Sequence, residues 1–140
     1  KNSIVVIGSI YAIDILEDNI ISSRERLFSI FTNIYEKNFK ESINTNLLKS
    51  IKFILERNII HGNALTLNYI NNDQPIIFSE WSMLSNKIKR RDFMLTDLIA
   101  YAPFEEGTLF SDLDEEVIIP KSIKDFKLIN FDQIYKYAKK

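Results

Sequence analysis

The chain has 140 residues, of which 46% are hydrophobic and 26% charged, with only three glycines and three prolines. This composition is typical of one soluble globular domain over residues 1–140, and it excludes a disordered or linker-rich chain. The net charge of −1 provides no overall attraction to nucleic acid or membrane. The absence of cysteine excludes disulfides and thiolate zinc sites, and a single histidine excludes a multi-histidine metal site.

Residues 2 to about 20 contain the apolar run IVVIGSIYAI from Ile4 to Ile13. Its apolar side chains recur at helical spacing, although the density of β-branched residues leaves a strand open for the first few. Ten residues are too short to span a bilayer, and no small-x-small cleavage site follows. We therefore expect a buried helix, no membrane partner and a cytoplasmic protein.

Two amphipathic helices are predicted next. Ser22 and Glu25 have the spacing of a capping box and are followed by a wide apolar stripe. The following helix starts near Asn44 or Thr45, and its apolar period continues until Gly62, which has the place of a C-terminal cap. This puts Arg57 and His61 four residues apart on one helix face.

After Gly62 the apolar period changes to two, which predicts a short β-hairpin over residues 65–79. Helical spacing resumes at Trp81 and continues to Ala102. An acidic loop follows over residues 105–116, and a last amphipathic helix begins at Asn130. The predicted fold is mostly α: a small bundle of four to five helices with an inserted hairpin.

The stretch ERNIIHGNA holds the residues that best fit a reaction at a phosphodiester. Histidine transfers protons near neutral pH, and arginine binds phosphate through two parallel hydrogen bonds. His61 would act on a ribose hydroxyl or a leaving oxygen, Arg57 would stabilise the phosphorane, and Asn58 would orient either group. The alternative is structural, because cationic side chains are common at helix C-termini.

The same stretch resembles the RN-x-I-x-HG signature of HEPN domains, the higher eukaryotes and prokaryotes nucleotide-binding superfamily. The resemblance implies a helical, homodimeric, metal-independent endoribonuclease of toxin–antitoxin or phage-defence systems, without a cofactor. Carried over by position, Arg57 and His61 would be catalytic, with Asn58 beside them. The family usually has four to six residues between the arginine and the histidine, whereas three intervene here.

A second candidate site is the basic run NKIKRRD. It holds Lys87, Lys89, Arg90 and Arg91. These side chains would neutralise the phosphates of an RNA backbone, or would form the solvated face of a helix. The acidic loop would meet a basic partner protein, cover the basic run, or remain solvated.

The sequence thus leads to two classes of function. The first is a dimeric endoribonuclease that cleaves RNA with Arg57 and His61. The second is a non-catalytic intracellular protein-binding module, of immunity, antitoxin or host-interaction type. A HEPN domain that has kept only RNA or nucleotide binding is an intermediate possibility.

Overall fold

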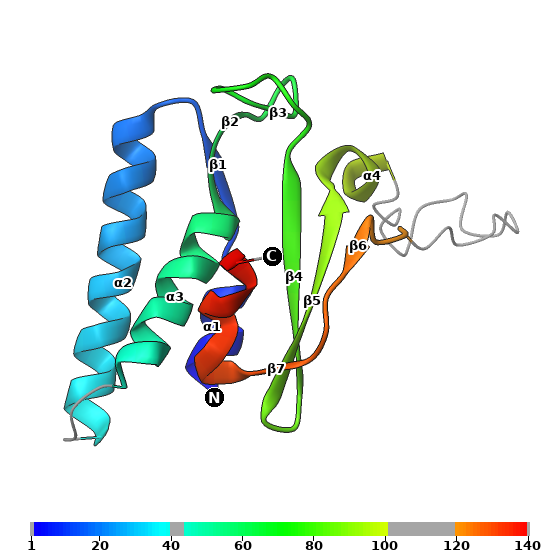
Figure 1. The fold of residues 1–140 in the computed structure, drawn as a ribbon. Coiled ribbons are helices and arrows are strands. Elements are labelled where there is room, and N and C mark those ends of the chain that lie inside the picture. Colours follow the sequence, from blue (N-terminus) through cyan, green and yellow to red (C-terminus); the bar gives the residue numbers. More distant parts are fainter. Residues whose placement is uncertain (1, 40–43, 101–119, 140) are drawn as a thin grey trace, which may run out of the picture.

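The computed structural model describes residues 2–39, 44–100 and 120–139 (Figure 1). The first half contains α1 (Asn2–Gly8), β1 (Ala12–Asp14), α2 (Glu17–Phe39), α3 (Thr45–Asn58), β2 (Ile59–Asn63) and β3 (Asn68–Tyr69). The second half contains β4 (Ile77–Leu84), β5 (Lys87–Met94), α4 (Leu95–Ala100), β6 (Lys124–Asp125), β7 (Ile129–Asn130) and the 3-10 helix η1 (Phe131–Lys139). The predicted acidic loop lies outside the described residues.

The prediction of a mostly α, all-helical bundle is wrong. About half of the structure is helical, and about 27% is strand in two sheets. The main error concerns the segment after Trp81, where the expected helix is replaced by β4 and β5, eight residues each. The buried side of β5 contains Arg90 and Asp92. Because charged residues normally mark a solvated face, this pair concealed the period of two that is typical of a strand.

The first sheet joins segments that are distant in the sequence. β1 runs parallel to β2, with Asp14 paired to His61, and β2 runs antiparallel to β3. The hairpin predicted over residues 65–79 is reduced to one bridge between Asn68 and Pro75. The first predicted helix is also shorter than expected, since α1 ends at Gly8 and β1 follows.

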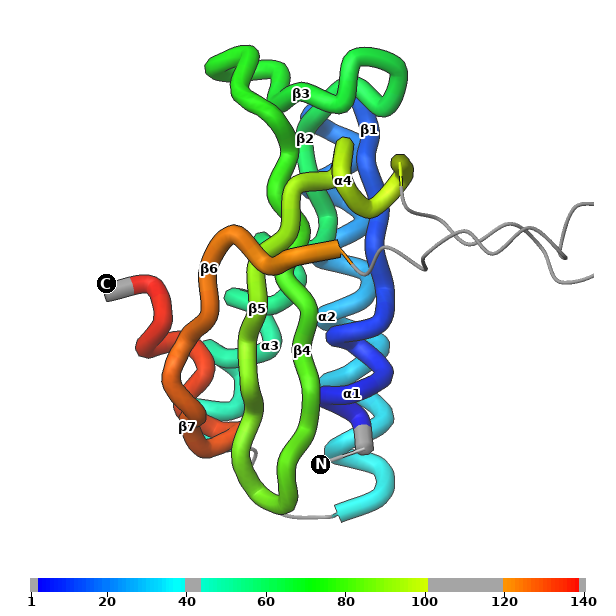
Figure 2. The backbone as a smooth tube through the Cα atoms, turned by 90° about the vertical axis from the view of Figure 1, so that its right-hand side faces the viewer, coloured from blue at the N-terminus to red at the C-terminus, as the bar shows by residue number. Residues whose placement is uncertain are grey.

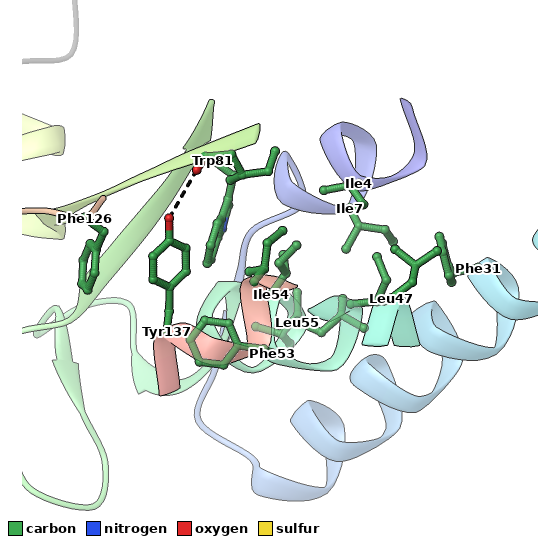
Figure 3. Close-up of a cluster of buried hydrophobic side chains, with 14 of the residues drawn as sticks. Ile4, Ile7, Phe31, Leu47, Phe53, Ile54, Leu55, Trp81, Phe126 and Tyr137 are labelled. Atoms are coloured by element: carbon green, nitrogen blue, oxygen red, sulfur yellow. Dashed lines mark hydrogen bonds between the residues drawn. The ribbon is translucent and has the colours of Figure 1, made fainter. Parts of the chain in front are cut away.

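The second sheet is built around the β4–β5 hairpin, with β6 and β7 on the free side of β5 (Figures 1 and 2). Its inner face packs against α3 and η1 and completes the core shown in Figure 3. The hydroxyl of Tyr137, on η1, donates to the carbonyl oxygens of Ile88 (3.2 Å) and Lys127 (2.5 Å). The predicted last helix therefore exists, and it holds the β5–β7 edge against α3.

The two central helices were predicted correctly, but some of their ends differ from the prediction. Asn44 caps α3 as expected, because its side chain accepts from the backbone N–H of Asn46 at 2.9 Å. α2, in contrast, begins at Glu17, before the predicted capping box. α3 ends at Asn58, four residues before Gly62, and the Arg24 side chain of α2 donates to the carbonyl oxygens of Glu56 and Ile59. Arginine thus takes the place of the expected glycine cap.

Gly62 lies inside β2, where an added Cβ would force its neighbours to shift. A Cβ there would lie 2.6 Å from Ile76 Cδ1 and 3.2 Å from the backbone oxygen of Asn68. We expect Gly62→Ala to lower the free energy of unfolding by about 1–3 kcal/mol through overpacking. Urea denaturation measures the change, and Thr66→Ala on the exposed loop is the control. Equal stability of the two variants would contradict this packing.

Candidate functional site

The structure does not bring Arg57 and His61 together on a helix face. Because α3 ends at Asn58, His61 lies in β2, and its Nε2 is 3.0 Å from the carbonyl oxygen of Ile15. The Arg57 guanidinium is exposed and lies 5.3 Å from the centroid of the Phe53 ring, on its own helix. The predicted i, i+4 geometry is therefore wrong, and the two side chains have different neighbours.

Asn58 has a structural role. Its side chain is fully buried. The amide Nδ2 donates to the carbonyl oxygen of Gly8 at 3.0 Å, and Oδ1 accepts from Trp81 Nε1 at 3.0 Å. The two hydrogen bonds of the amide join α1, α3 and β4 in the core. Because the side chain is buried there, it does not reach a phosphate at the surface.

The four basic residues of the second predicted site lie on β5 and point to two faces of the sheet. Strand alternation places Lys87, Lys89 and Arg91 on the outer face and Arg90 on the inner face. On the outer face, Lys89 Nζ lies 3.3 Å from Asp125 Oδ2, and Arg91 Nη2 lies 2.7 Å from Glu80 Oε2. Most of the charge expected to attract RNA is thus neutralised within the sheet or buried beneath it.

Arg90 forms the buried polar centre of the domain. Its Nε and Nη2 donate to the two carboxylate oxygens of Asp92, each at 2.8 Å, and Ser79 Oγ donates to the same carboxylate at 2.7 Å. The guanidinium lies 4.1 Å from the ring centroid of Phe126, and three more rings surround it at 5.6–5.9 Å, those of Phe53, Trp81 and Tyr137. We call this group the Arg90 cage.

An apolar groove of about 480 Å³ opens on the outer face of the second sheet. Two cross-strand pairs form its floor and one wall, Phe78 with Phe93 and Glu80 with Arg91. Residues from three more places in the chain complete the lining: Tyr11, Leu95 and Leu98 on α4, and Pro120. In Figure 2, α4 and the segment leading into β6 cross the upper end of this face, and no other described helix covers it.

The polar groups of the groove are fixed by hydrogen bonds. The Tyr11 hydroxyl donates to the Ser79 carbonyl oxygen at 2.8 Å, and its ring meets that of Phe78 edge-on at 5.0 Å. Partial burial raises the pKa of the Glu80 carboxyl, but hydrogen bonds from Arg91 and Ser82 outweigh burial, so this pKa is below its ordinary value. Glu80 and Arg91 therefore remain an ion pair at neutral pH.

The groove was not predicted from the sequence. Its residues come from five separate segments that only the tertiary fold brings together. One local signal was present, because Phe78, Glu80, Arg91 and Phe93 alternate with their neighbours in the manner of a strand face. Reading residues 77–94 as a hairpin would have placed these four side chains together.

The described residues lack two specific features, a cluster of metal ligands and a membrane-spanning helix. In residues 2–39, 44–100 and 120–139, no cluster of three or more histidine and acidic side chains is suited to bind a metal ion. Within the same ranges no helix has the length and apolarity needed to cross a membrane. Comparison of the chain with protein-family models, curated proteins and solved structures gives no match. The resemblance to HEPN domains therefore stays a prediction.

Proposed function

We propose that this domain recognises another protein, and that the outer-face groove receives an apolar side chain from an acidic segment of that partner. The observation that carries the proposal is the groove itself, a mostly apolar and aromatic concavity with a single ion pair in its wall. Sites of this kind hold ligands through apolar contact and orient them with a few polar groups. An open groove across the β4–β5 hairpin suits an extended polypeptide.

Arg91 provides the polar contact. Both carboxylate oxygens of Glu80 approach the same nitrogen, Nη2, at 3.0 and 2.7 Å. Among the described residues, the other guanidinium nitrogens have no hydrogen-bond partner, and the residue is partly exposed. Because guanidinium groups bind carboxylates in a paired geometry, Arg91 favours an Asp or Glu close to the apolar anchor.

The residues around the groove also favour an acidic partner. Lys121, which is exposed, directly follows the groove residue Pro120. Positive side chains at the edge of the groove, such as Lys121 and Arg91, favour an acidic partner. The contacts of Arg57, Asn58 and His61 favour this function over RNA cleavage, which requires these side chains to act at one accessible phosphate.

Selection from a displayed library of random peptides tests the proposal. We expect enriched peptides to share one large apolar residue beside Asp or Glu. Phe78→Glu should weaken their binding by about 30-fold or more, in the range of a lost anchor contact, and Arg91→Gln should reduce the preference for the acidic residue. Lys49→Gln, at an exposed position of α3, is the control.

Two results would overturn the proposed function. One is a failed peptide test, in which the enriched peptides share no consensus or Phe78→Glu binds them with wild-type affinity. The other is cleavage of RNA by the purified chain that disappears in the folded His61→Ala variant. That second result would establish the endoribonuclease in place of the recognition domain.

A further inference from the structure

α2 carries more apolar surface than the rest of the described chain covers. Only Ile20 and Phe31 are buried in this 23-residue helix. Ile21, Phe28 and Tyr35 follow one another at intervals of seven residues, which places them along one stripe. Ile21 is 49% exposed, and at the end of the stripe Phe39 is 59% exposed, with its ring 4.8 Å from that of Tyr35.

The stripe borders a groove of about 340 Å³ between α2 and α3. Ile21, Phe28 and Leu55 provide its apolar lining, and four charged residues surround them: Arg24, Glu25, Lys52 and Glu56. Figure 1 shows that α2 and α3 run antiparallel and that α2 forms the side of the molecule farthest from β5. The groove is thus independent of the outer-face groove on the second sheet.

The charges along this groove are self-complementary. Arg24 is engaged in capping α3. Glu25 lies on α2, and Lys52 lies on α3 with its Nζ 4.8 Å from the centroid of the Phe28 ring. Neither residue forms an ion pair within the described part of the chain. The apolar stripe is therefore flanked by an acid, Glu25, on α2, and by a base, Lys52, together with a second acid, Glu56, on α3.

We propose that a second copy of this chain covers the α2–α3 groove. In a two-fold interface the same patch faces itself, so the patch must carry opposite charges on the two sides of the axis. The flanking residues meet this condition, because the two-fold brings Glu25 of each chain to the partner's Lys52 over the packed Ile21 and Phe28 side chains. In this dimer the two outer-face grooves point away from each other and remain open, which gives a bivalent domain.

Charge exchange tests the proposed dimer in the absence of any ligand. Analytical ultracentrifugation should show the wild-type chain at twice its mass of 16.4 kDa. Glu25→Lys and Lys52→Glu should each raise the dimer dissociation constant about ten-fold or more, and the double variant should recover the wild-type value. Ile21→Asp should give a monomer, whereas Leu65→Asp, at a site 94% exposed in a loop, should stay dimeric.

A wild-type chain that sediments as a monomer at about 0.1 mM would overturn the dimer. So would an Ile21→Asp variant that remains dimeric, or a double charge variant whose dimer dissociation constant is higher than that of either single variant. Circular dichroism confirms that each variant is folded. Because no peptide takes part in the measurement, its outcome is independent of the outer-face groove and of the function proposed for it.

Discussion

Replacing Asp92 with alanine should lower the free energy of unfolding by about 3–5 kcal/mol. Arg90 is only 4% exposed, and both Arg90–Asp92 hydrogen bonds are 2.8 Å long. Removal of the carboxylate leaves a buried guanidinium without its counter-charge and removes an acceptor from Ser79. The aromatic rings of the Arg90 cage contribute attraction through their faces, but they do not replace a carboxylate. Equilibrium urea denaturation measures the loss.

Two companion variants make this result specific. Asp125→Ala removes the exposed carboxylate that pairs with Lys89, and it should change stability far less, because solvent screens that pair. A double replacement, Arg90→Met with Asp92→Leu, should recover a large part of the stability lost in Asp92→Ala, because no unpaired charge remains. An Asp92→Ala variant as stable as Asp125→Ala would show that the Arg90 cage contributes little.

The same ion pair explains why the fold class was not predictable. Helix α3 could be identified from its sequence because its apolar stripe and its cap at Asn44 are local signals. On β5, the inward-facing residues include Arg90 and Asp92, whose burial depends on rings supplied by α3, β4 and residues 126–137. From residue type alone, both would be placed on the solvent-exposed face. The alternation of buried and exposed residues that identifies a strand is then no longer visible in the sequence.

The end of α3 was mispredicted for a related reason. Ile59 and Ile60 continue the apolar spacing of the helix, and Gly62 has the usual place of a cap. The chain instead becomes extended at Ile59 and pairs with β1, far earlier in the sequence. Such parallel pairing follows from tertiary contacts and leaves no mark in the local sequence, apart from the β-branched pair Ile59 and Ile60. The predicted catalytic geometry depended on this boundary.

The candidate groove was even less accessible to sequence reasoning. Tyr11 reaches the carbonyl oxygen of Ser79 across 68 positions of the chain. The β4–β5 register then sets Phe78 beside Phe93 and Glu80 beside Arg91. The sequence did indicate that NKIKRRD bears charge, but only the pairing of the strands shows which charges are exposed and which are neutralised.

Asn58→Ala distinguishes most clearly between the structural and the catalytic interpretation of ERNIIHGNA. The substitution leaves the Trp81 indole N–H and the Gly8 carbonyl oxygen without their partner in the core. We expect a loss of about 2–4 kcal/mol in the free energy of unfolding, since each buried unsatisfied group costs about 1–3 kcal/mol. Trp81 is the only tryptophan, so its fluorescence reports both the unfolding transition and the local change in the folded state.

The adjacent residue provides the matched control. Arg57 is exposed and contacts the Phe53 ring of its own helix, so Arg57→Ala should change stability by about 0.5 kcal/mol or less. A catalytic Asn58 would give the opposite pattern, with wild-type stability in Asn58→Ala and an RNA-cleaving activity that Arg57→Ala also abolishes. The two interpretations thus differ in both stability and activity. The buried position of Asn58, between α1 and β4, is the physical reason to expect the structural result.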